Sequence, residues 1–124
     1  MSLKVSGFSS AALDYKIIYF DNQNTPTAAI QENVTGTSGR WYSVDVDNKS
    51  GSAVYVRLYD GYGPVLGTSA SHWGFRVEAT TSNRFEIPSG APFAALNVWT
   101  TSGDDPKDSS PPASSGVTVT VLTS

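Results

Sequence analysis

Short segments in which apolar and polar residues alternate dominate this sequence, and this pattern restricts the fold more than any other feature. The clearest segments are residues 42–47 and 54–59, where valine or leucine alternates with serine, aspartate, tyrosine or arginine. A period of two indicates a half-buried β-strand. The residues between them, Asn48-Lys49-Ser50-Gly51-Ser52, favour tight turns. We therefore predict a β-hairpin at the centre of the chain.

Similar strand patterns recur along the rest of the chain. Further strands are predicted at residues 15–20, 27–34, 73–79, 85–87, 93–100 and 117–122. Residues 93–100 are apolar on both faces, as in a strand that is covered on both sides or lies in an interface. Residues 117–122 alternate valine with threonine and carry no charge, so we expect this strand to lie inside a sheet rather than at an open edge.

About eight short strands without a convincing helix predict an all-β fold. Within that class, the strand spacing favours an antiparallel β-sandwich of the jelly-roll or Greek-key type. The length of 124 residues fits one domain, residues 1–124. Residues 1–13 are predicted to be a flexible or exchanged arm, and residues 101–115, rich in Asp, Ser and Pro, a long exposed loop.

Composition excludes several classes of function. The chain has no cysteine, which rules out disulfides and a thiol nucleophile. Its formal charge is −3 and its basic residues are scattered, so we expect no nucleic-acid partner. No apolar run reaches the length of a membrane span or resembles a signal peptide, so we expect no membrane partner and synthesis without secretion.

Candidate catalytic and metal-binding residues are few. The sole histidine, His72, lacks an accompanying Gly-x-Ser-x-Gly motif, so we do not expect it to be catalytic. Two acidic sets offer oxygen ligands suited to calcium, namely Asp45 with Asp47, and Asp104 with Asp105 and Asp108. Neither matches an EF-hand, and turn capping or solvation is the simpler interpretation. We predict a protein that is not an enzyme and has no cofactor; a carboxylate-pair hydrolase is the weakest alternative.

The aromatic residues of the central strands point to a binding surface. Tyr55 and Tyr59 share the strand face of Arg57, opposite the valines, and Trp41 is expected to face outward as well. Exposed rings of this kind mark subunit contacts or a sugar-stacking platform, unless a second layer of chain covers them. The candidate interface or ligand-stacking residues are therefore Trp41, Tyr55, Arg57 and Tyr59, whereas Trp73 and Trp99 fit a core better.

Several short segments follow one another in a distinctive order. They are Glu32-Asn33-Val34-Thr35-Gly36, residues 42–48, residues 54–60, Pro64-Val65-Leu66-Gly67-Thr68-Ser69, Ile87-Pro88-Ser89-Gly90, Phe93 and Val117-Thr118-Val119. In this order, residues 30–124 resemble small virion-associated proteins of tailed bacteriophages, including marine phages. The chain departs from that pattern at Ala70-Ser71-His72-Trp73, which stands where those proteins usually have a proline.

The resemblance implies a structural role without catalytic residues, as a capsid decoration, head-fibre or tail-associated protein. It further implies a virion location, with assembly in the cytoplasm of the bacterial host. We expect self-association, as a homotrimer, through Trp41, Tyr55, Tyr59 and the sheet edges, together with contacts to other virion proteins. The alternative is a carbohydrate-binding module or adhesin whose exposed rings stack on host glycans.

Overall fold

The fold contains β-strands and no helix in the part of the chain that the structure describes. The computed structural model describes the backbone of residues 2–9, 14–22, 30–110 and 116–124, and the side chains of the last two ranges. Its strands are β1 (Ser2–Ser9), β2 (Asp14–Asn22), β3 (Gly39–Asn48), β4 (Val54–Asp60), β5 (Trp73–Val77), β6 (Thr81–Phe93), β7 (Leu96–Thr101) and β8 (Val117–Thr123). Every strand pair is antiparallel. The predicted all-β antiparallel class is confirmed.

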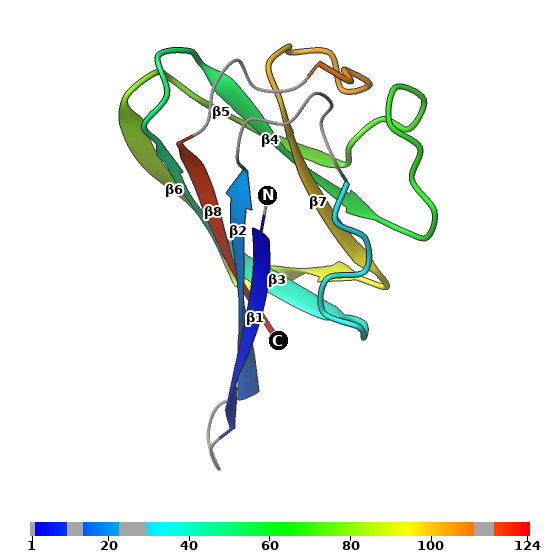
Figure 1. The fold of residues 1–124 in the computed structure, drawn as a ribbon. Coiled ribbons are helices and arrows are strands. Elements are labelled where there is room, and N and C mark those ends of the chain that lie inside the picture. The colour runs from blue at the N-terminus through cyan, green and yellow to red at the C-terminus, as the bar shows by residue number, and fades with distance from the viewer. Residues whose placement is uncertain (1, 10–13, 23–29, 111–115) are drawn as a thin grey trace.

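The strands form two sheets that pack face to face. One sheet has five strands in the order β1-β2-β8-β3-β6, and the other has three in the order β5-β4-β7 (Figure 1). Valines and leucines from both sheets fill the space between them and are at most 1% exposed, including Val44, Val121, Val56 and Leu58. This two-layer arrangement is consistent with a β-sandwich. Strand β8 lies between β2 and β3, which confirms that the Val-Thr strand is inside a sheet.

The predicted central hairpin is wrong. Strands β3 and β4 are consecutive, but β3 belongs to the five-stranded sheet and β4 to the three-stranded sheet. The intervening turn is a corner, and the buried side chain of Asn48 holds it. Its amide nitrogen donates to the carbonyl oxygens of Ser52, Val77 and Glu78 at 2.8, 3.2 and 3.0 Å. The valines of the two strands therefore face one another across the core instead of lying side by side.

A second buried amide, that of Asn97, ties residues 31–34 to strand β7. Its oxygen accepts a hydrogen bond from the backbone N–H of Asn33, and its nitrogen donates to the carbonyl oxygen of Tyr59. Backbone hydrogen bonds also join Gln31 to Val98 in both directions, at 2.9 and 3.0 Å. This segment falls in the predicted strand 27–34, of which residues 27–29 lie outside the described residues.

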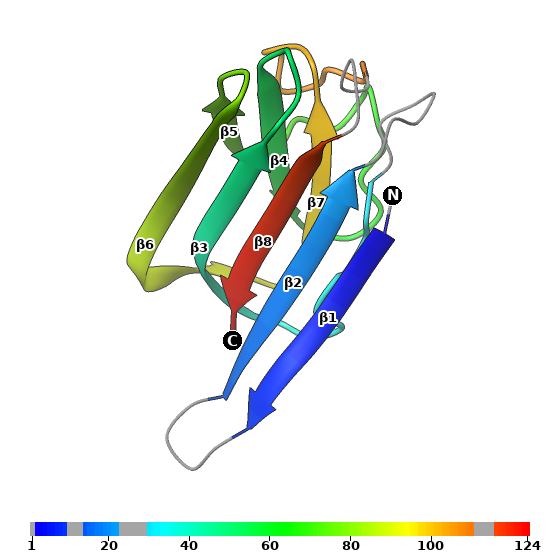
Figure 2. The ribbon, with the colours of Figure 1, turned by 60° about the vertical axis from the view of Figure 1, so that its left-hand side comes forward.

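The first residues of the chain form part of the sheet. Strand β1 pairs with β2 along its whole length, from Ser2 opposite Asp21 to Ser9 opposite Asp14. Residues 2–9 of the expected arm are thus a strand, and residues 10–13 lie outside the described part. Figures 1 and 2 show the β1–β2 hairpin extending past the rest of the sandwich at one end.

Candidate functional site

Trp41 lies in the core, so its predicted exposure is wrong. Its side chain is 1% exposed and meets the rings of Trp73 and Phe75 edge to face, with centroids 5.7 and 5.8 Å apart. The register of β3 against both neighbouring strands shifts between Trp41 and Ser43. Such a β-bulge changes which residues face inward, and it places Trp41 on the buried side with Val44.

Arg57 is also buried, because the loop of residues 102–110 folds over it. The side chain is only 4% exposed. Its Nη2 donates to the carbonyl oxygens of Gly103 and Asp105 at 2.7 and 3.1 Å, and its Nε to Thr101 Oγ1 at 3.4 Å. Burial lowers the pKa of Arg57, while the negative charge of Asp108 acts in the opposite direction. The guanidinium is therefore an internal anchor for this loop.

The two tyrosines flank this anchor and are half-buried. Tyr55 lies between two arginines, with its ring 5.1 Å from the guanidinium carbon of Arg57 and 5.7 Å from that of Arg76. Tyr59 stacks on His72 at a centroid distance of 4.4 Å. The structure thus brings Tyr55, Arg57 and Tyr59 together on the outer face of β4. Loops cover much of this face of β4. This is the alternative to exposed interface or sugar-stacking rings that the sequence analysis considered.

His72 has a structural contact that accounts for its position. Its Nδ1 accepts a hydrogen bond from the backbone N–H of Asp60 at 2.9 Å. The Asp60 carboxylate in turn accepts the backbone N–H groups of Ala94 and Ala95, at 2.7 and 3.3 Å. Since Nδ1 is the acceptor, the neutral imidazole carries its proton on Nε2. The His72 contact fastens the end of the β4–β5 connection to β4, and the carboxylate contacts fasten the turn between β6 and β7 to the same end of β4.

The acidic residues of loop 102–110 also serve the loop itself. Asp108 accepts hydrogen bonds from the backbone N–H of Gly103 and from the Ser110 hydroxyl, at 2.8 and 3.0 Å. Asp105 accepts the backbone N–H of Lys107 at 2.9 Å. Among the described residues, no three His, Cys, Asp or Glu side chains are grouped so that they could hold a metal ion.

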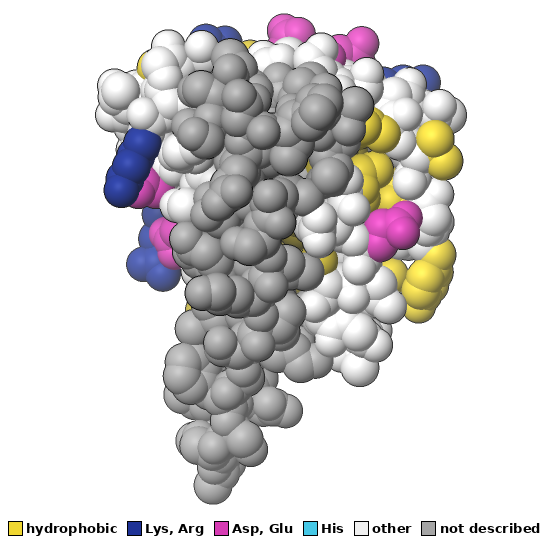
Figure 3. Space-filling view, in the orientation of Figure 1, with side chains coloured by type: hydrophobic (Ala, Val, Ile, Leu, Met, Phe, Trp, Pro, Cys, Tyr) yellow, Lys and Arg dark blue, Asp and Glu magenta, His cyan; other side chains and the backbone are white. Residues whose placement is uncertain are grey.

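The most exposed large hydrophobic side chains of residues 30–110 and 116–124 are Tyr62, at 76%, and Val65, at 57%. Both belong to the connection between β4 and β5. Figure 3 shows hydrophobic side chains on one face of the molecule as small separate spots. The described part of that face therefore presents no broad apolar patch of the kind that marks an obligate interface.

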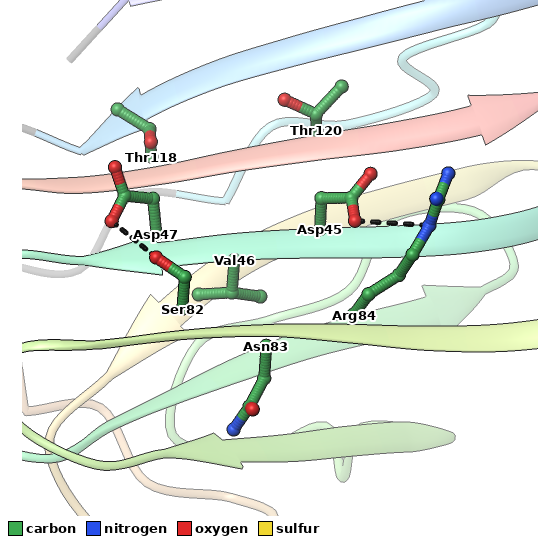
Figure 4. A pocket seen from close by; sticks show the side chains of 8 residues that line it. All are labelled: Asp45, Val46, Asp47, Ser82, Asn83, Arg84, Thr118 and Thr120. Atoms are coloured by element: carbon green, nitrogen blue, oxygen red, sulfur yellow. Dashed lines mark hydrogen bonds and ion pairs between the residues drawn. The ribbon is translucent and has the colours of Figure 1, made fainter.

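A polar groove lies on the outer face of the five-stranded sheet. It is an open, shallow depression of about 260 Å³, lined on this face by Asp45 and Asp47 of β3, Ser82 and Arg84 of β6, and Thr118 and Thr120 of β8 (Figure 4). Arg84 Nε lies 3.2 Å from a carboxylate oxygen of Asp45, and the Ser82 hydroxyl donates to Asp47 at 2.8 Å. Hydroxyls and carboxylates fixed on rigid strands suit a ligand rich in hydroxyl groups.

Sequence reasoning placed Asp45 and Asp47 on one strand face but missed the groove. Its other walls come from β6 and β8, more than 30 residues away along the chain. The signal that was available is weak. Polar residues alternate with apolar ones in β3 and β8 and follow one another at residues 81–84 of β6, but the pairing of these strands is needed before their polar residues form one surface.

Comparisons with known proteins identify no relative. No protein-family model matches the sequence, and no curated protein matches it either. The resemblance to virion proteins of tailed phages therefore stays a prediction. In the part of the chain that the structure describes, no helix is long and apolar enough to cross a bilayer.

Proposed function

We propose that this chain is a non-enzymatic structural protein of a phage particle, which acts by binding further copies of itself and other virion proteins. The observation that carries the proposal is the five-stranded sheet that ends at β1, since an unpaired strand can accept a strand from another chain. The one histidine of the chain supports the same conclusion. The Nδ1 atom of His72 already accepts a hydrogen bond from the backbone N–H of Asp60.

We also propose that the connectivity is that of a jelly roll. After β2, residues 31–34 lie beside β7, and the chain then forms β3, β4, β5, β6, β7 and β8 in that order. Each of these steps changes sheets except the one from β4 to β5. This alternation is what two nested Greek keys require. Jelly rolls occur in viral capsid proteins and in lectins, so the topology agrees with both candidate functions by analogy alone.

Solution mass tests the self-association. Light scattering after size exclusion, at micromolar concentration with and without calcium, should give a discrete multiple of 13.1 kDa. A mass of about 39 kDa, three times 13.1 kDa, would match the trimer expected from the resemblance. A mass of 13.1 kDa throughout the micromolar range would overturn the proposal.

The polar groove favours a second candidate function, the binding of host glycans. Its carboxylates and hydroxyls can accept and donate hydrogen bonds to sugar hydroxyls. The test is a glycan array with the unmodified protein, the variant Asp47→Asn and the control Tyr62→Ala. Binding that is lost in Asp47→Asn and kept in Tyr62→Ala supports this function. A blank array with the folded protein refutes it.

A further inference from the structure

Three of the four sheet edges carry features that prevent pairing with another chain. Edge strand β6 contains Pro88 and Pro92 and exposes Arg84 and Glu86. Proline removes a backbone donor and charge opposes edge-to-edge contact. Strand β5 is only five residues long, and short edge strands are poor templates. Residues 31–34 cover the edge of β7 through their backbone hydrogen bonds.

Among the described residues, strand β1 carries the fewest of these features. It runs for eight residues, Ser2–Ser9, with no proline and a single charge, that of Lys4. No strand of the described chain pairs with its outer edge. Alternate residues of such an edge strand direct their N–H and C=O groups away from the sheet, where another strand can bind them.

The far end of the β1–β2 hairpin needs support. Strand β8 pairs with β2 only from Lys16 onward, so Asp14 and Tyr15 pair with β1 alone. Figure 2 shows this end of the hairpin beyond the body of the sandwich. A two-stranded ribbon is marginally stable in water, and a third strand stabilises it.

We propose that β1 pairs antiparallel with β1 of a second copy across a two-fold axis, joining two five-stranded sheets into one continuous sheet. The inference rests on the proposed function, because it names the surface through which the chain self-associates. A second copy is the favoured occupant because an antiparallel edge is self-complementary. The features of β6 oppose head-to-tail pairing of β1 with β6, so the assembly closes at two chains.

Charge restricts the register of this pair. Like charges directly opposite one another destabilise a sheet, so the register that sets Lys4 against Lys4 is disfavoured. The registers centred on Val5 or Ser6 keep the two lysines apart. The register centred on Val5 sets Ser6 opposite Lys4 of the other chain. The register centred on Ser6 sets it opposite Ser6 of the other chain. A lysine at position 6 therefore meets another lysine in both registers.

The test compares Ser6→Lys with Asn83→Lys, which adds the same charge to the exposed surface of the other edge strand of the sheet. Light scattering should give about 26 kDa, twice 13.1 kDa, for the unmodified protein and for Asn83→Lys, and 13.1 kDa for Ser6→Lys. Hydrogen exchange on the unmodified protein supplies a second measurement. The alternate amides of β1 that point away from β2 should be protected in the dimer, and dilution to the monomer should remove that protection.

The outcomes separate the inference from the proposed function. A stable multimer whose mass is the same in Ser6→Lys overturns pairing at β1 and leaves self-association standing. A mass of 39 kDa, or one that grows steadily with concentration, overturns two-fold closure. A protein that is monomeric at every concentration overturns both. Outer-edge amides of β1 that exchange equally in the concentrated and dilute protein overturn the edge pairing even where Ser6→Lys fails to fold.

Discussion

The guanidinium of Arg57 holds loop 102–110 against the outer face of the three-stranded sheet, and replacing it with methionine tests that role. Methionine keeps an unbranched side chain of similar length, so the packing of the stem is largely preserved. The substitution removes the hydrogen bonds to the carbonyl oxygens of Gly103 and Asp105 and the contact with the Tyr55 ring.

The size of the loss follows from these contacts. Two short hydrogen bonds from a charged donor contribute about 1.5–3 kcal/mol each, or roughly 3–6 kcal/mol together. The third, to Thr101 Oγ1, is long at 3.4 Å and is left out of this sum. Removing a buried charge offsets part of the loss, because burial disfavours the cation and lowers its pKa. We expect the free energy of unfolding to fall by about 2–4 kcal/mol.

Urea denaturation followed by tryptophan fluorescence measures this loss. Trp99 pairs with Arg57 across β4 and β7 and is 1% exposed, so it reports on the same region. Arg57→Lys should lie between the wild type and Arg57→Met, because one ammonium cannot reproduce the guanidinium fork. The matched control is Arg76→Met, on the same face but exposed and paired with Glu78. It should leave the urea midpoint unchanged.

Two results would refute this account of Arg57. The first is a urea midpoint for Arg57→Met that moves no further than that of Arg76→Met. The second is a loop that is cleaved by protease no faster in Arg57→Met than in the wild type. Either would show that the loop is held by contacts other than the guanidinium.

Three further substitutions have expected effects on the free energy of unfolding, each measured by urea denaturation. Asn48→Ala removes the donor shared by three carbonyl groups at the corner between the sheets and should cost about 2–4 kcal/mol; Asn48→Ala as stable as wild type contradicts this. Gly74→Ala places a Cβ atom 2.8 Å from Nη1 of Arg57 and should lower the free energy of unfolding by about 1–3 kcal/mol. Gly51→Ala is the control, because a Cβ atom there has no other atom within 4 Å. Trp41→Ala empties a core site and should cost about 3–5 kcal/mol, which a solvent-exposed ring would not.

Strand positions were predictable because a period of two is a local property of the sequence. The predicted segment 117–122 corresponds to β8 (Val117–Thr123), and residues 73–79 contain β5 (Trp73–Val77). Strand β8 buries the valines that the alternation selects, and in β5 Val77 is buried while Trp73 and Phe75 are partly buried against the core. The pattern needs no knowledge of which strand lies next to which.

The partner of each strand was not predictable in this way. The alternation predicts that Val44 and Val56 are buried. They would be buried whether their strands lay side by side in one sheet or faced one another in two sheets. The corner at Asn48 decides between these arrangements, because its amide reaches carbonyl oxygens 29 and 30 residues further along the chain. A turn-rich segment shows only that the chain changes direction.

The burial of Arg57 had a signal in the sequence. Residues 93–100 were predicted to be covered on both faces or in an interface, and every residue of β7 (Leu96–Thr101) is in fact buried. Because Arg57 lies directly opposite Trp99 in the β4–β7 pair, the cover predicted for that face of β7 is expected over Arg57 as well. The exposure predicted for Trp41 had no such signal against it, since a β-bulge leaves little trace in composition.

Several polar side chains of the described residues bind the protein's own backbone. Asn48, Asn97, Arg57 and Asp60 each bond to main-chain groups of segments distant in sequence, which fixes the loops of a chain without disulfides. The two surfaces that we propose for binding, the edge of β1 and the groove on the outer face, belong to the same sheet.

The two surfaces are geometrically related. Antiparallel pairing of β1 with β1 requires a two-fold axis perpendicular to the sheet, and such an axis keeps the outer faces of both copies on the same side. A dimer formed in this way would present two grooves in one direction. Self-association and glycan binding are then compatible, because paired grooves bind a repeated ligand with an avidity that one groove lacks. Ser6→Lys should accordingly weaken binding to a dense glycan surface while leaving the affinity for a single free oligosaccharide unchanged.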